Sequence, residues 1–182
     1  MNVSRMIERL VHDIYCLTPK KLVLCCFLAV VAYCFLCRKY AGRRWLRPCL
    51  GGLLALWLSA VLWITVFSRS AGNTEFHWLP LSTYWRVLSG ESRELLRSAF
   101  MNAVLFFPAG LLLGGLLPGH RSFRWQLVCA VICFGLISLG IELTQFFNRL
   151  GNAEFDDVLH NTLGAAAGLA AFHVKWSDSQ QT

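Results

Sequence analysis

Charged side chains are scarce in this chain of 182 residues. Asp, Glu, Lys and Arg together make up 15% of it, whereas apolar residues make up 56%, and the mean hydropathy is +0.52. Because soluble domains carry about 25% charged residues, this shortage argues against an ordinary soluble domain and favours a membrane protein. The length fits a single domain.

A basic patch interleaved with aromatic residues, as nucleic-acid-binding domains have, is also missing. The net charge of +7 comes from Lys and Arg residues that flank apolar runs. That placement is typical of contact with anionic lipids and of topology control, so membrane lipids are the expected partners and nucleic acid is not. These residues divide almost evenly between the two sides of the predicted membrane, which leaves the orientation open.

The chain lacks a secretory cleavage site, an internal repeat and a disulfide framework. No small-x-small site follows the first apolar run, so we expect a retained anchor. Most of the eight cysteines lie within apolar runs, where Cys behaves as a small hydrophobe. Cys34 and Cys37 form a CxxC pair but have no βαβ context and no second ligand pair, which favours a structural role over redox or metal chemistry.

Long apolar runs are what the sequence does have. A membrane-spanning helix needs about 20 residues, and the runs are continuous rather than alternating, which indicates helices rather than a barrel. The sequence therefore predicts an all-α fold, a polytopic membrane helical bundle with about five transmembrane helices. The five segments are 22–37, 49–67, 99–117, 125–143 and 158–174.

Polar residues are predicted to gather at one face of the membrane. If the third and fourth spans form a hairpin, the second and fourth end, and the third and fifth begin, on the same side. This topology brings together Arg69, His77, Asn102, Glu142, Gln145, Asp156, Asp157, His160 and Asn161. Since a charge in a span costs about 2–3 kcal/mol, Glu142 needs a partner, and Arg69 and Arg149 are the candidates.

Helical spacing groups these residues further. Intervals of four, three and four define one stripe on the fourth span: Ser138, Glu142, Gln145 and Arg149. The same intervals define a stripe on the fifth span: Asp157, Asn161, Gly164 and Gly168. The glycines of the fifth span, with Gly110 and Gly114 on the third, form small-residue faces that allow close helix contact.

Purely structural roles remain open for several of these residues. Asp156 and Asp157 open a helix and would serve as simple caps there. Asn102 and Asn161 would serve as hydrogen-bonding links between helices. Arg69 would serve as an interfacial anchor after its span.

Five short segments resemble the VanZ-like family of bacterial membrane proteins. They are TVFSR (65–69), HWLPL (77–81), NAVLFFPAGLLLG (102–114), IELTQFF (141–147) and DDVLHNTLGAAAG (156–168). The resemblance covers about residues 50–172 and matches Arg69, Asn102, Pro108, Gly110, Glu142, Gln145, Asp156, Asp157, Asn161 and Gly164. The family's Pro-x-Arg is missing, because Asn148 and Arg149 stand in that region without a proline.

The resemblance implies an organisation and a location. Residues 1–48 would be an N-terminal segment with an extra transmembrane helix and a basic loop. Residues 49–174 would form a four-helix VanZ-like membrane domain, and residues 175–182 a polar tail. The protein would be a multi-pass protein of the bacterial plasma membrane. The family is associated with resistance to the glycopeptide teicoplanin, and has been proposed to join enzymes that act on lipid head groups or lipid-linked carriers.

The leading hypothesis is an envelope enzyme that acts on a lipid head group or lipid-linked cell-wall precursor. Its predicted catalytic residues are Glu142, Asp156 and Asp157. Its predicted substrate-binding residues are Arg69, Asn102, Gln145 and Asn161. The cofactor is unknown; a divalent metal fits the hard carboxylate oxygens, but no metal ligand is assigned.

Two other hypotheses remain. A protein that binds or shields a lipid without catalysis would alter drug access to the envelope. A transporter is less favoured, because the polar groups occupy one end of the spans and no inverted repeat is present.

Overall fold

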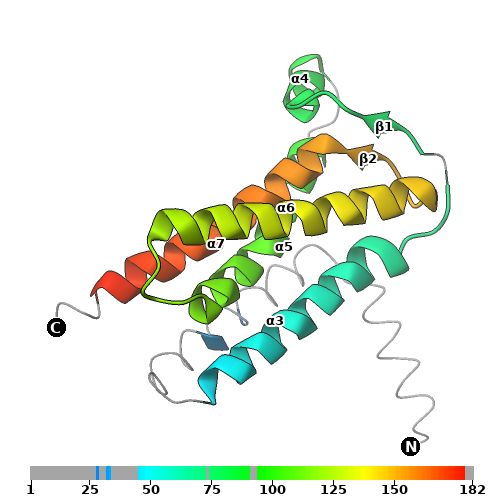
Figure 1. Cartoon of the computed structure of the whole chain (residues 1–182). Coiled ribbons are helices and arrows are strands. Elements are labelled where there is room, and N and C mark those ends of the chain that lie inside the picture. The colour runs from blue at the N-terminus through cyan, green and yellow to red at the C-terminus, as the bar shows by residue number, and fades with distance from the viewer. Residues whose placement is uncertain (1–27, 29–31, 34–44, 73, 91–93, 179–182) are drawn as a thin grey trace, which may run out of the picture.

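A computed structural model describes residues 28, 32–33, 45–72, 74–90 and 94–178. The predicted span 22–37 therefore lies almost entirely outside the described residues. The elements, in chain order, are α3 (Leu46–Leu62), the π-helix η1 (Trp63–Phe67), β1 (Phe76–His77), α4 (Ser82–Leu88), α5 (Glu94–Leu116), α6 (Phe123–Phe147), β2 (Ala153–Glu154) and α7 (Phe155–Asp178). Figure 1 shows the long helices as a bundle, with β1, β2 and α4 at one end.

The predicted all-α membrane fold is confirmed. Three helical stretches of the described chain are long and apolar enough to cross a membrane: Leu46–Phe67, Glu94–Leu116 and Phe123–Phe147. They coincide with the second, third and fourth predicted spans. The fifth predicted span is helical, but α7 is not among these three.

The position of α7 explains its mixed composition. It packs along α5 and α6, and buries Ala165 and Leu169 in the core with Phe106 and Phe134. The rings of Phe106 and Phe134 meet edge to face, with centroids 6.1 Å apart. Because α7 is the helix that its neighbours cover, it tolerates small and polar residues that a lipid-facing helix would not.

Glycines bring the backbones of α5 and α7 into direct contact. A Cβ added to Gly164 would lie 2.1 Å from the carbonyl oxygen of Ala103, and one added to Gly168 would lie 2.0 Å from that of Phe107. No side chain fits at such distances. The close helix contact predicted from the small-residue faces is therefore confirmed, and the two helices run parallel in a constant register.

The long connection between η1 and α5 contains two short elements, β1 and α4. Its strand β1 pairs in parallel with β2, aligning Phe76 with Ala153 and His77 with Glu154. The helix α4 follows and was not predicted. Glu94 and Arg97 lie in the exposed first turn of α5, where their side chains form an ion pair of 3.0 Å.

Enlarging a glycine between α5 and α7 should destabilise the bundle. We expect Gly168→Ala to lower the thermal unfolding midpoint in detergent, because its methyl group would overlap the carbonyl oxygen of Phe107; overpacking costs about 1–3 kcal/mol. Gly140→Ala on α6 is the matched control, since nothing lies within 4 Å of its added Cβ. Equal midpoints for both variants would contradict the close packing.

Candidate functional site

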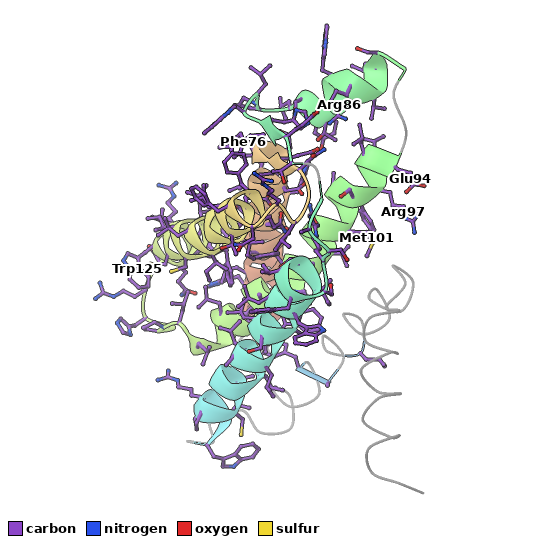
Figure 2. All side chains as sticks on the ribbon, turned by 90° about the vertical axis from the view of Figure 1, so that its right-hand side faces the viewer. Phe76, Arg86, Glu94, Arg97, Met101 and Trp125 are labelled. Atoms are coloured by element: carbon purple, nitrogen blue, oxygen red, sulfur yellow. The ribbon has the colours of Figure 1, made fainter. Side chains whose placement is uncertain are left out.

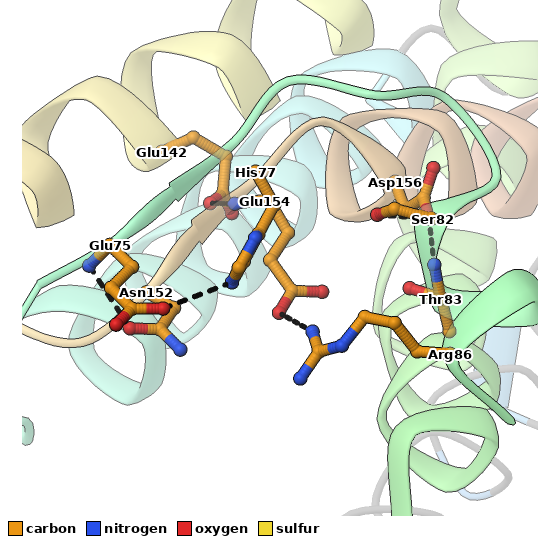
Figure 3. Close-up of polar contacts among 9 residues, drawn as sticks. All are labelled: Glu75, His77, Ser82, Thr83, Arg86, Glu142, Asn152, Glu154 and Asp156. Carbon is orange, nitrogen blue, oxygen red and sulfur yellow. Dashed lines mark hydrogen bonds and ion pairs between the residues drawn. The ribbon is translucent and has the colours of Figure 1, made fainter. Parts of the chain in front are cut away.

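The candidate site lies where α6 ends and α7 begins. The two helices are joined by a short connection that contains β2, and β1 lies alongside it. Figure 2 places Phe76 and Arg86 together at this end of the molecule, with Glu94 and Arg97 projecting from α5 nearby. Figure 3 shows the polar contacts of this region, which link the η1–α5 connection to the start of α7.

Glu142 is buried on α6, with 3% of its surface exposed. Its carboxylate accepts a hydrogen bond of 3.1 Å from the backbone N–H of Glu154 (Figure 3). It is also within electrostatic range of Asp157 and Arg69. The predicted proximity of Glu142 to Arg69 therefore holds in the structure. The backbone donor was not predicted, because the pairing of β1 with β2 places it there.

Asp157 lies on the first turn of α7, ahead of the predicted span 158–174. Burial raises the pKa of Asp157 to about 6, and the negative charge of Glu154 adds to the rise. The positive charge of Arg69 and a hydrogen bond from the Asn102 side chain act in the opposite direction. Asp157 is thus an acid that changes protonation near neutral pH, linked directly to Asn102 on α5.

Arg69 reaches this group from the end of η1. Its Nη1 would lie 3.1 Å from a Cβ placed on Gly151, so the guanidinium packs over that glycine. Gly151 has a φ of +123°, a conformation that glycine adopts with least strain. The sequence prediction missed Gly151; its position just after α6 was the available signal, because glycine is common where helices end.

Gln145 and Asn161 join the helices around the site. The side-chain N–H of Gln145 donates to the carbonyl oxygen of Thr65 in η1 at 2.9 Å, one of the helix-end acceptors without an intrahelical partner. The amide of Asn161 donates to the hydroxyl of Ser138 at 2.7 Å. Both side chains are buried, and their carbonyl oxygens have no hydrogen-bond partner among the described residues.

Asp156 is committed to α4. It is fully buried, and its carboxylate accepts hydrogen bonds from the backbone N–H groups of Leu81 and Thr83 and from the hydroxyl of Ser82; Figure 3 shows Ser82 and Thr83 beside it. Burial alone would raise the pKa of Asp156, but the hydrogen bonds outweigh it and lower the pKa. Asp156 acts as a cap, though for α4 rather than for its own helix.

Two further contacts hold α4 against the start of α7. The hydroxyl of Tyr84 lies 2.9 Å from Nε2 of His160. The guanidinium of Arg86 forms an ion pair of 3.3 Å with Glu154 (Figure 3). His160 therefore faces α4, whereas Nε2 of His77 lies 3.7 Å from the carboxylate of the exposed Glu75.

Arg149 does not continue the stripe predicted on α6. The helix ends at Phe147, and Arg149 adopts a φ of +55° beyond it. The N–H of Leu150 bonds to the carbonyl oxygen of Gln145, and that of Arg149 to Phe146. This pattern is a Schellman motif, which ends the helix. The prediction that extended helical spacing to Arg149 was therefore wrong.

The acidic side chains of this site could act as general acid or base next to the guanidinium of Arg69. With Asp156 bound to α4, two acids of the site remain: Glu142, which is buried, and Asp157, which is partly buried. No group of three or more His, Cys, Asp or Glu side chains that could hold a metal ion is found among the described residues.

Replacing Asp156 should release α4. Asp156→Asn replaces one of the two acceptor oxygens with an N–H₂ group, which cannot accept the hydrogen bonds that Leu81, Ser82 and Thr83 donate. A lost buried hydrogen bond costs about 1–3 kcal/mol, so we expect faster amide exchange and proteolysis within residues 76–90. Ser82→Ala removes only the hydroxyl contact and should have a smaller effect. Unchanged exchange in Asp156→Asn would contradict the role of this cap.

The protonation of Asp157 should affect stability in a defined direction. A carboxyl whose pKa is raised by folding stabilises the fold below its unfolded pKa of about 3.9, and that contribution is lost as the pH rises through the folded pKa. Asp157→Asn should therefore raise the unfolding midpoint relative to the wild type more at about pH 7.5 than at about pH 5. A difference that is independent of pH would contradict the pKa near 6.

Comparison with known proteins agrees with the sequence resemblance. Residues 52–176 match the family model described as VanZ/LLP1. The chain is 30% identical over 130 residues to the protein VanZ of Enterococcus faecium. This alignment covers 66% of this chain and 71% of that protein. No solved structure matches the chain. The chain belongs to the VanZ/LLP1 family.

Proposed function

We propose that this protein is a multi-pass protein of the bacterial plasma membrane that acts on a lipid head group or a lipid-linked cell-wall carrier. The observation that carries the proposal is the pair formed by the buried Glu142 and the partly buried Asp157, with Arg69 in electrostatic range of both. The pair comes from two different helices at one end of the bundle. Acidic groups within a membrane bundle cost free energy of folding, so their presence in a chain so poor in charge indicates a functional role.

The proposed roles follow from what each side chain has available. Arg69 is exposed, and its planar guanidinium suits two-point binding of a phosphate. Asp157, with a pKa of about 6, is suited to take up or release a proton near neutral pH. Asn102 orients Asp157 through its hydrogen bond. Glu142 supplies a second acidic group on the facing helix.

The buried amides narrow the ligand class. The carbonyl oxygens of Gln145 and Asn161 accept hydrogen bonds, and neither has a partner among the described residues. Together with the two carboxylates they make the site richer in acceptors than in donors. A head group with hydroxyl or ammonium groups beside its phosphate would suit both Arg69 and the two carboxylates. Asp156 we reassign from catalysis to positioning, because its oxygens are engaged by α4.

A part in glycopeptide resistance, teicoplanin included, follows from the same proposal. A change in an envelope lipid or carrier would change the surface that the drug meets. The competing proposal is binding or shielding without catalysis. The two differ in whether the carboxyl groups must ionise, since a binding site tolerates an amide of the same shape better than an acid–base group does.

Conservative substitution of the two acids separates these proposals. Asp157→Asn and Glu142→Gln should abolish the protein-dependent change in lipid and lipid-carrier composition, and any drug resistance, at normal expression levels. Loss of one general acid–base group lowers the rate by about 10²–10⁴-fold. Glu94→Gln is the control, because its ion pair with Arg97 is exposed. Unchanged lipid profiles in the two site variants would reject catalysis and leave the shielding role.

A further inference from the structure

The connection that carries β1 and α4 exposes an unusual amount of apolar surface. Five side chains between Phe76 and Leu88 are more than half exposed, at 59–81% of their surface. They are Trp78, Leu79, Leu81, Trp85 and Leu88. Such a concentration of exposed large apolar residues marks an interaction surface rather than a random scatter.

Trp85 and Leu88 of α4 lie on the side away from the bundle. Trp85 and Leu88 lie three residues apart on α4, which places them on one helical face, and the exposed Leu81 is the residue directly before the helix. The opposite side holds the buried Thr83, whose N–H bonds to Asp156. The contacts Tyr84–His160 and Arg86–Glu154 also hold α4 to the protein. The exposed face is thus presented in a fixed direction by a firmly attached helix.

The exposed surface continues the apolar surface of a membrane-spanning helix. Phe147 and Phe146 end α6, with ring centroids 5.6 Å apart. The ring of Phe146 meets that of Phe76 edge to face at 5.4 Å, and Phe76 contacts Trp78 at 3.7 Å. An unbroken row of aromatic rings therefore leads from the end of α6 to the segment before α4.

We propose that the segment Phe76–Leu88 lies in the membrane interface, with Trp78, Leu79, Trp85 and Leu88 inserted at the boundary between head groups and acyl chains. Aromatic residues concentrate at this depth because they have an apolar body and a polar edge. A short amphipathic helix binds there through its apolar face. The proposal rests on the membrane fold and not on the chemistry proposed above. It places the Asp156-bound side of α4, and with it the start of α7, at the level of the lipid head groups.

Site-specific fluorescent labelling tests the depth of this segment. A full-length variant without its native cysteines would carry one new cysteine, Leu88→Cys or Leu79→Cys, labelled with an environment-sensitive dye. The protein would be reconstituted into phosphatidylethanolamine–phosphatidylglycerol vesicles. Glu75→Cys is the matched control, because its side chain is 74% exposed but polar and precedes β1. A dye at position 79 or 88 is expected to be quenched strongly by lipids that carry a spin label near the head group. A dye at position 75 is expected to be quenched strongly by aqueous iodide.

Two outcomes would overturn the proposal. Iodide quenching at position 88 as strong as at position 75, without lipid quenching, would place the segment in water. Cross-linking of Leu88→Cys between two copies, without lipid quenching, would make a second copy the partner. If the cysteine-free chain does not fold, tryptophan fluorescence of the protein with its native cysteines replaces the dye measurement. Trp85→Phe should then reduce the part of the tryptophan emission that brominated lipids quench, and no reduction would count against membrane insertion.

Discussion

The backbone contact between α5 and α7 is the constraint on which the rest of the structure depends. Gly164 meets Ala103 and Gly168 meets Phe107 at distances that leave no room for a side chain. This contact fixes the height of one helix against the other. It thereby sets Asn102 beside Asp157. A wider spacing between the helices would separate that hydrogen-bonded pair and leave an acidic group of α7 without its neighbour from α5.

A second layer of contacts closes the end of the bundle around the acids. The parallel pair of β1 and β2 aims the N–H of Glu154 at Glu142. Asp156 holds α4 by its first residues. The two neighbouring acids therefore have different roles. Asp156 holds α4 in place, whereas Asp157 has a pKa of about 6. Buried hydrogen-bond donors determine which acid takes which role.

Local spacing predicted the parts of the site that lie on long helices. The interval from Glu142 to Gln145 and that from Asn161 to Gly164 each describe one helix face, so periodicity was sufficient for them. It failed at Arg149, because a Schellman motif ended the helix two residues earlier. The helical core and the family resemblance were likewise readable from apolar runs and ordered motifs.

Contacts between distant segments could not be predicted in this way. The bonds from α4 to Asp156 join residues more than 70 positions apart. The N–H of Glu154 becomes a donor to Glu142 only after two-residue strands pair. Such short elements carry almost no periodic signal. The sequence therefore predicted Asp156 as a site residue but could not distinguish it from Asp157, which differs only in the groups that folding places around it.

The central claim is that Arg69, Asn102, Glu142 and Asp157 form one site for a phosphate-bearing lipid. Native mass spectrometry of the purified protein tests it most directly, through the lipids that remain bound. We expect the wild type, Glu94→Gln and Asp157→Asn to retain a phosphate-bearing lipid or carrier that Arg69→Gln loses, because Arg69 is the proposed phosphate-binding group and an amide at position 157 preserves the shape of the site. Equal retention of the same lipids by all four proteins would contradict it.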